Sequence, residues 1–228
     1  MTIDLNCDMG ELEDGALEAA LMAFVTSANI ACGAHAGDLG TMERTALLAL
    51  ERGVRIGAHP GYPDRENFGR LELAMSPTAI AQTVYEQIVL LDDVVTRLGG
   101  AVAYVKPHGA LYNVAVHNAD VARAIAEGAV RWNPGTLLFG LAGSPMLDVW
   151  RAMGVRVAGE AFADRRYESD GTLRSRKLPG ALITDPAEAA AQAVQLANAG
   201  LAETICVHGD TPGAAAILKA CRDALPLQ

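Results

Sequence analysis

Four histidines, with acidic and basic side chains beside them, occur directly after apolar segments of this sequence. They are His35, His59, His108 and His208, and they lie in the runs "ACGAHAGD", "GAHPGYPD", "VKPHG" and "VHGD". Imidazole and carboxylate groups transfer protons in enzymes and bind transition-metal ions, and ammonium groups stabilise developing negative charge. A lone histidine is most often structural, but four at equivalent positions indicate one shared site.

Short apolar segments alternate with helix-like segments along the whole chain. The candidate strands are residues 3–7, 28–32, 54–58, 101–105, 136–141, 155–158 and 204–207, with a weak one near 181–183. The candidate helices are residues 42–52, 77–98, 119–131, 145–153, 186–199 and 212–224. Such alternation is typical of an α/β fold with parallel strands and right-handed crossovers.

Polar residues at the ends of six candidate strands favour a closed barrel over an open sheet. An open sheet collects ligand-binding residues only where the strand order reverses, whereas all strands of a barrel end at one mouth. We therefore predict a TIM-like (β/α) barrel of seven or eight strands, regular or not. At 228 residues, the chain is expected to form one domain over residues 1–228.

Side-chain alternation places several of these polar groups on the same face of their strands. Lys106 and His108 share a face, as do Asn6 and Asp8, if the strands stay extended to their ends. Pro107 fixes the backbone between Lys106 and His108. We therefore expect this pair to face the mouth of the barrel and to contact the substrate.

Composition and charge narrow the kind of protein. The net charge of -9 argues against a nucleic-acid or anionic-membrane partner, because both require basic surfaces. The start of the chain lacks a basic and then apolar leader, and residues 19–37 divide better into a helix end and a strand than into a membrane span. Four cysteines without CxxC spacing are expected to be reduced and mostly buried. These features predict a cytoplasmic enzyme.

A set of motifs also resembles a known family. The runs "IDLNCDMGE", "TSANIACGAHAGD", "IGAHPGYPD" with "FGR", "VKPHGALYN", "FADRRY" with "DGTLRSR", and "ICVHGDTPGA" are similar, in this order, to those of the LamB/YcsF family. The resemblance implies a fold like the glycoside hydrolase and deacetylase barrels. It also implies one subunit of an ATP-dependent 5-oxoprolinase, which opens 5-oxoproline (pyroglutamate) to L-glutamate together with two further subunits. The segments near residues 11–25 and 198–204 are shorter than is usual in the family.

The implied chemistry suggests roles for the polar residues. Ring opening of a lactam requires activation of the carbonyl, donors for the developing oxyanion and a proton for the leaving nitrogen. Hydrolysis of 5-oxoproline has little thermodynamic driving force, which explains the coupling to ATP. Phosphorylation of the lactam oxygen by ATP would make the ring carbon electrophilic. Lys106 and Arg165 would then neutralise phosphate or carboxylate charge. The predicted catalytic residues are Asp8, His59, Lys106, His108, His208 and Asp210.

Further polar residues near the strand ends are predicted to bind the substrate. Some follow from their position and others from the resemblance alone. They are Asn6, Asn29, His35, Asp38, Tyr62, Arg70, Glu160, Asp164, Arg165 and Arg176.

Two cofactors are considered. ATP is implied by the resemblance, but neither GxxxxGK[ST] nor GxGxxG occurs after a strand, so we expect ATP to be used through the assembled enzyme. An aspartate and two histidines at the first three strand ends, Asp8, His35 and His59, suit a divalent metal such as Zn, Mn or Ni. A metal-free hydrogen-bonded cluster is the alternative.

Two functions of other classes stay open at this stage. A metal-dependent carbohydrate or amide deacetylase would need neither ATP nor a partner chain. A non-catalytic binding subunit would keep the cavity but tolerate loss of its histidines. The many titratable groups at one rim argue against the second, because burying them without a function costs stability.

Overall fold

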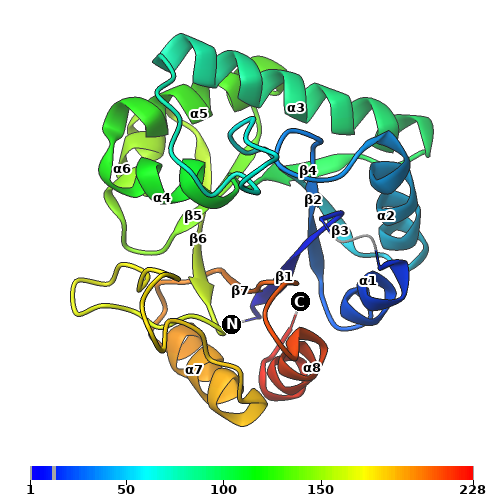
Figure 1. Cartoon of the computed structure of the whole chain (residues 1–228), viewed down its shortest axis with the longest axis vertical. Helices are drawn as coiled ribbons and strands as arrows, with labels where there is room; N and C mark the ends of the chain where they lie inside the picture. Colours follow the sequence, from blue (N-terminus) through cyan, green and yellow to red (C-terminus); the bar gives the residue numbers. More distant parts are fainter. Residues whose placement is uncertain (1, 12–13, 228) are drawn as a thin grey trace.

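The computed structural model describes residues 2–11 and 14–227 and contains a closed parallel barrel (Figure 1). Seven strands pair in sequence order, and β1 closes the barrel against β7. The strands are β1 (Asp4–Met9), β2 (Ser27–Ala31), β3 (Arg55–His59), β4 (Val102–Val105), β5 (Leu137–Leu141), β6 (Arg156–Phe162) and β7 (Thr204–Val207). The predicted TIM-like barrel is confirmed, with seven strands among the described residues.

Helices form a ring around the strands in Figure 1. They are α1 (Gly15–Met22), α2 (Leu39–Glu51), α3 (Pro77–Arg97), α4 (Gly109–His117), α5 (Ala119–Trp132), α6 (Pro145–Ala152), α7 (Pro186–Asn198) and α8 (Ala214–Ala224). The six predicted helices are confirmed to within a few residues. Helix α1 was predicted only by its end, and α4 was not predicted.

The prediction of a weak strand near residues 181–183 is wrong. Leu182 forms only an isolated antiparallel bridge with Arg165, and the segment belongs to the long connection between β6 and α7. Pro179 and Gly180 precede the three apolar residues, and the N-cap of α7, Asp185, follows them closely. The segment is therefore too short for a strand and runs past the end of the barrel, drawn in yellow in Figure 1.

The interior of the barrel has an apolar part and a polar part. The rings of Tyr104 and Phe139 stack at 4.0 Å between centroids, and both are fully buried. The space for this stack comes from Gly57, where an added Cβ would lie 2.2 Å from the Tyr104 ring. The Tyr104 hydroxyl donates to Asn29 Oδ1 at 2.7 Å, which connects the apolar part to the polar side chains nearer the mouth.

Two further expectations can be compared with the structure. All four cysteines are buried and none forms a disulfide, as predicted. Among the described residues, no helix combines the length and hydropathy needed to span a membrane.

Candidate active site

The carboxyl ends of the strands surround a cavity of about 490 Å³. Residues from the ends of β1, β3, β4 and β7 line it, which is the convergence that the strand-end pattern predicts. Of the predicted site residues, the cavity is lined by Asp8, His59, Arg70, Lys106, His108, Arg165, Arg176, His208 and Asp210.

Lys106 is buried at the base of this cavity between two carboxylates. Its Nζ lies 2.8 Å from Asp8 Oδ1, 2.9 Å from Glu160 Oε1 and 3.1 Å from Cys206 Sγ. Burial disfavours the charged ammonium, but Asp8, Cys206 and Glu160 outweigh it and hold the pKa of Lys106 well above its ordinary value. The lysine is therefore a fixed positive charge at neutral pH.

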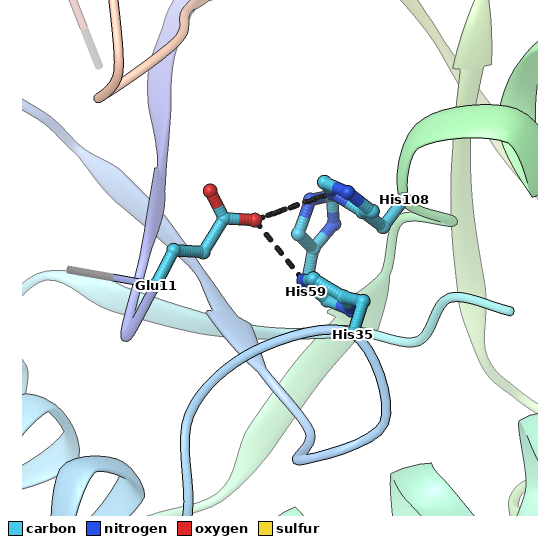
Figure 2. Close-up of side chains that lie close together, drawn as sticks. All are labelled: Glu11, His35, His59 and His108. Atoms are coloured by element: carbon cyan, nitrogen blue, oxygen red, sulfur yellow. Dashed lines mark hydrogen bonds and ion pairs between the residues drawn. The ribbon is translucent and has the colours of Figure 1, made fainter. Parts of the chain in front are cut away.

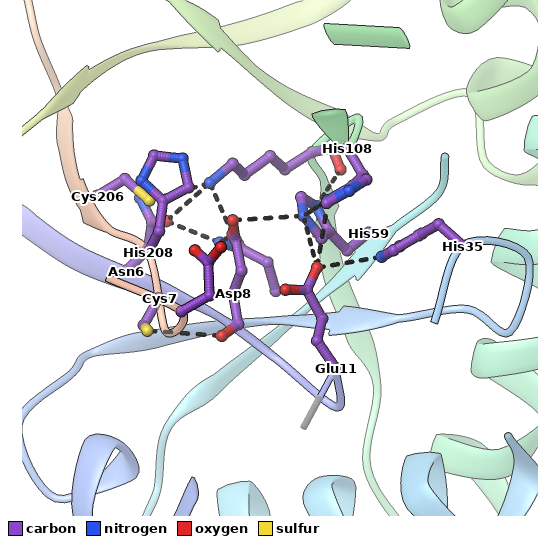
Figure 3. Close-up of polar contacts among 12 residues, drawn as sticks. Asn6, Cys7, Asp8, Glu11, His35, His59, His108, Cys206 and His208 are labelled. Atoms are coloured by element: carbon purple, nitrogen blue, oxygen red, sulfur yellow. Dashed lines mark hydrogen bonds and ion pairs between the residues drawn. The ribbon is translucent and has the colours of Figure 1, made fainter. Parts of the chain in front are cut away.

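Asp8 is the carboxylate between Lys106 and His59. Figure 3 shows Asp8 beside the labelled histidines. It accepts hydrogen bonds from Lys106 and from Asn29 Nδ2, both at 2.8 Å, and its Oδ2 lies 3.5 Å from His59 Nε2. Burial alone would raise its pKa, but the charges of His59 and Lys106 hold the pKa of Asp8 well below the ordinary value. Asp8 is ionised and faces the cavity.

A layer of amides supports Lys106 from below. Asn6 Nδ2 donates to Glu160 Oε1 at 3.1 Å and to Thr204 Oγ1 at 2.7 Å, and Asn29 Nδ2 donates to Asn6 Oδ1 at 2.7 Å. Asn6, Asn29 and Glu160 are fully buried and do not line the cavity. These three residues therefore lie one layer below the cavity and hold Lys106 in place, and their predicted contact with substrate stays a prediction.

Three histidines and a glutamate form a compact cluster beside Asp8 (Figure 2). Glu11 Oε1 lies 3.1 Å from His35 Nε2, 3.2 Å from His108 Nδ1 and 3.7 Å from His59 Nε2. These residues lie at or just beyond the ends of β1, β2, β3 and β4, so the closure of the barrel brings them together. Of the predicted metal ligands, His35 and His59 belong to this cluster, whereas Asp8 lies beside it and pairs with Lys106.

Backbone carbonyls fix the tautomers of two of these histidines. His59 Nδ1 lies 2.8 Å from the carbonyl oxygen of Lys106, and His108 Nε2 lies 2.9 Å from that of Phe68. A carbonyl only accepts hydrogen bonds, so both of these ring nitrogens carry a proton. In the neutral imidazoles, the lone pairs of His59 Nε2 and His108 Nδ1 therefore face each other across 3.0 Å.

His35 occupies the outer side of the cluster. Its ring stacks on that of His108 with 3.8 Å between centroids and 3° between planes. Burial, with a smaller effect from His108, lowers the pKa of His35 to about 4, so the ring is neutral at pH 7. The Nε2 proton of His35 then points to Glu11. His35 does not line the main cavity but borders a second cavity of about 240 Å³.

His208 and Asp164 form a hydrogen-bonded pair across the mouth from the cluster. His208 Nδ1 and its backbone N–H lie 3.0 and 3.1 Å from Asp164 Oδ2. Burial acts to raise the pKa of Asp164, but His208 and the Thr211 hydroxyl lower it below the ordinary value. Asp164 is fully buried, does not line the cavity and orients His208, and its predicted contact with substrate stays a prediction.

Arginines from two connections, β3–α3 and β6–α7, meet at the outer rim. Arg176 Nη1 lies 2.9 Å from Asp210 Oδ2, and Arg70 Nη2 contacts the same oxygen at 2.5 Å. These contacts outweigh the effect of burial and lower the pKa of Asp210, which is therefore a paired anion. Arg165 is buried, donates to the carbonyl of Arg174 at 2.7 Å and leaves Nε without a partner among the described residues. Burial, and then the charge of Arg176, lower the pKa of Arg165 to about 10.

Two predicted substrate contacts lie away from the main cavity. Tyr62 is buried in the apolar core. Asp38 is exposed and caps α2 by accepting a hydrogen bond from the Thr41 amide at 2.8 Å. Asp38 also lines the second cavity, beside His35. The predicted substrate contacts of Tyr62 and Asp38 stay predictions.

Glu11 is the site residue that the sequence reasoning missed. It lies just beyond β1, and Gly10 at φ 71° turns the chain so that the glutamate returns toward the histidines. Glu18 accepts a hydrogen bond from the Gly10 amide and another from the Thr45 hydroxyl, which fixes this turn. The available signal was the glutamate at the end of "IDLNCDMGE", together with the glycine before it.

The parallel barrel has a buried lysine, an oriented histidine and a histidine cluster at one mouth. This arrangement is typical of a barrel enzyme. The profile of the LamB/YcsF family matches residues 3–228 of this chain. The chain belongs to the LamB/YcsF family.

Similar proteins agree with this assignment. A 5-oxoprolinase subunit from Heliobacterium modesticaldum is 45% identical over 241 residues, covering 99% of this chain and 94% of the relative. The corresponding 5-oxoprolinase subunit from Chloroflexus aggregans is 46% identical, and the match covers 99% of this chain and 95% of the relative. The crystal structure of a lactam utilization protein from Thermus thermophilus is 39% identical, with a TM-score of 0.91 over 98% of this chain and 96% of that one.

More distant solved structures share the fold alone. They include a T48 deacetylase at 14% identity, with a TM-score of 0.50 over 98% of this chain and 82% of that one. A family 39 glycoside hydrolase from Bacteroides cellulosilyticus WH2 is 12% identical, with a TM-score of 0.52 over 99% of this chain and 64% of that one. The predicted likeness to deacetylase and glycoside hydrolase barrels is thus confirmed for the fold.

Proposed function

We propose that this protein is a subunit of an ATP-dependent 5-oxoprolinase and that its barrel mouth opens the lactam ring of 5-oxoproline to give L-glutamate. The observation that carries the proposal is the 490 Å³ cavity, which joins a buried charged lysine to an oriented histidine. Membership of the LamB/YcsF family and the names of the relatives support the substrate. A cavity of this size is in the usual range for small-molecule sites.

The charges around the cavity suit a small anionic lactam. Arg165 and Arg176 line the cavity near its rim, and their guanidinium groups are the proposed donors for the substrate carboxylate. Guanidinium groups bind carboxylates and phosphates through charge-assisted hydrogen bonds. Lys106 lies deeper and would stabilise negative charge on the ring carbonyl oxygen.

The proposed reaction balances as two hydrolyses. ATP transfers its γ-phosphoryl group to the lactam oxygen, and ADP leaves. Water adds to the ring carbon, the C–N bond breaks and the nitrogen takes up a proton, which gives γ-glutamyl phosphate. A second water molecule releases phosphate and L-glutamate. The first step makes the ring carbon electrophilic, and hydrolysis of ATP drives the overall change.

His208 is the proposed proton-transfer residue. Asp164 holds its Nδ1–H, which leaves Nε2 for a ligand in the cavity. Nε2 can take a proton from the attacking water and return one to the leaving nitrogen. Asp8, ionised at the cavity floor, would position the water. His108 Nε2 donates to the Phe68 carbonyl, and its Nδ1 faces Glu11 and His59, so we assign proton transfer to His208 and place His108 in the histidine cluster.

A divalent metal ion is a further part of this proposal. The Glu11, His35, His59 and His108 cluster has the donor atoms that such an ion prefers, and three of its members line the cavity. When bound there, the ion would supply a Lewis acid next to the ring carbonyl. The roles of Lys106 and His208 do not depend on it.

The proposal includes two further subunits and use of ATP through the assembled enzyme, in the cytoplasm. A metal-dependent deacetylase is the second candidate, favoured by the histidine cluster alone. The experiment is release of L-glutamate from 5-oxoproline by this chain, with and without ATP and with each partner chain omitted in turn. Turnover only with ATP and all subunits supports the proposal. Robust turnover by this chain alone would contradict its role as one of several subunits, and deacetylation without ATP would favour the second candidate.

A further inference from the structure

The inner side of the histidine cluster contains an electrostatic conflict. The lone pairs of His59 Nε2 and His108 Nδ1 face each other at 3.0 Å, and Glu11 Oε1 lies 3.2 Å from His108 Nδ1 and 3.7 Å from His59 Nε2. Three electron-rich atoms packed this closely repel one another unless a proton or a metal ion lies among them. The backbone carbonyls of Lys106 and Phe68 prevent the rings from escaping this arrangement by a change of tautomer.

We infer that Glu11, His59 and His108 bind one divalent first-row transition-metal ion, with His35 as the residue that positions Glu11. The ligand set differs from the Asp8, His35 and His59 set that the sequence suggested. Two imidazoles and one carboxylate are a set that zinc and similar ions use when further positions stay open to water or substrate.

The spacing of the donor atoms fits such an ion. Ligands that lie about 2.0–2.1 Å from a tetrahedral metal are separated from one another by about 3.3 Å. The three separations among Glu11 Oε1, His59 Nε2 and His108 Nδ1 are 3.0, 3.2 and 3.7 Å, on both sides of that value. All three residues line the main cavity, so an ion held by them would be reached from the substrate side.

His35 is excluded as a ligand by its orientation. Its ring is parallel to that of His108, within 3°, with 3.8 Å between centroids. An ion bound to an imidazole lies close to the ring plane, and one ion cannot lie in two parallel planes. His35 instead donates its Nε2–H to Glu11 Oε1 at 3.1 Å, as residues around metal sites commonly do for a ligating carboxylate.

A second group of donor atoms provides a rival site. Asp8, Cys206 and His208 also lie close enough together to hold an ion. However, Lys106 Nζ lies 2.8 Å from Asp8 and 3.1 Å from Cys206 Sγ, and its positive charge opposes a cation there. Burial is the main reason why the pKa of the Cys206 thiol lies well above its ordinary value, so the neutral thiol is a weak ligand.

The experiment is titration of the chelator-treated full chain with Zn²⁺ by calorimetry, and with Co²⁺ by visible absorption. The variants are Glu11→Gln and His59→Asn for the proposed ligands, and His35→Phe for the positioning residue. Two controls are His208→Ala, which removes a donor of the rival site, and His117→Ala, which removes an exposed histidine of the same cavity. Circular dichroism and thermal melting check that each variant is folded.

The wild-type chain should bind one ion, and the two ligand variants should weaken binding by at least about 100-fold. His35→Phe keeps the stacked ring but removes the donor, and should weaken binding by about 10-fold. His208→Ala and His117→Ala should bind as the wild type does. Absence of ion binding by the wild type, equal binding by all variants, or loss confined to His208→Ala would each overturn the inference. Glutamate release is measured separately, so failure here is distinguishable from failure of the lactam proposal.

Discussion

Replacement of Lys106 by methionine should destabilise the protein strongly, because the lysine separates two buried carboxylates. Its Nζ lies 2.8 Å from Asp8 and 2.9 Å from Glu160, so these two carboxylate oxygens are at most about 5.7 Å apart by the sum of those distances. With an effective dielectric constant of about 20, two like charges at that separation repel by about 3 kcal/mol. We therefore expect the Lys106→Met variant to lose about 3 kcal/mol of its free energy of unfolding at pH 7.

The loss should depend on pH in a defined direction. Without the lysine, burial and repulsion raise the folded-state pKa of one of the two carboxylates above its unfolded value. A carboxylate with a raised folded-state pKa stabilises the fold at low pH and loses this effect as the pH rises through that pKa. The deficit relative to the wild type should therefore be small near pH 4 and grow toward pH 7.

Urea unfolding followed by circular dichroism measures this difference. The matched control is Lys219→Met, because Lys219 pairs with Asp223 on the surface, where such a pair contributes little. The double variant Lys106→Met/Glu160→Gln removes one of the two opposed charges and should recover at least half of the loss. Equal stability of Lys106→Met and Lys219→Met at pH 7 would refute the description of Lys106 as a charge shared by two buried carboxylates.

Two other changes test the rim and the barrel interior. Arg165→Met should raise the KM for 5-oxoproline by about 10-fold to 100-fold in the assembled enzyme, because one charge-assisted contact to the carboxylate is lost. The control Lys177→Met, an exposed charge at the same rim, should change KM little, and a similar rise in both variants would argue against a specific contact. Gly57→Ala should lower the free energy of unfolding by about 3 kcal/mol or more, because its Cβ would lie 2.2 Å from the Tyr104 ring. Gly15→Ala, at a position open to solvent, is the control for the same urea measurement, and an equal effect of both changes would contradict the packing described for the barrel interior.

The barrel could be predicted because its signals are local and repeated. Apolar segments of strand length alternate with helical patterns, and helices such as α3 begin with a clear cap in Ser76 followed by Pro77. Helix α4 was not predicted because it begins directly after the strand-end motif at His108, with no separate cap signal. The strand prediction near residue 182 was wrong because three apolar residues in a row resemble a short strand. Only the structure shows that seven other strands already close the barrel.

The sequence predicted most residues that gather at the barrel mouth, but not how far each one lies below the opening of the cavity. Alternation correctly placed Asp8 and Lys106 on inward faces and put Asn6 on the same face as Asp8, but it did not indicate that Asn6 lies in a layer below Lys106. Period 2 tells which side of a strand a residue occupies, but not how far it lies along the barrel axis. Glu11 was missed because its position depends on the turn at Gly10.

The most direct test of the central claim is the rate of L-glutamate release by the assembled enzyme that carries His208→Ala in this chain. Proton transfer by a positioned side chain contributes about 100-fold or more to a rate. We predict a loss of at least that size in kcat, with thermal melting of the chain unchanged within a few degrees. The His117→Ala variant, changed at an exposed histidine of the same cavity, should support the wild-type rate. Wild-type turnover by the assembly with His208→Ala would contradict the claim that this cavity carries out the ring opening through His208.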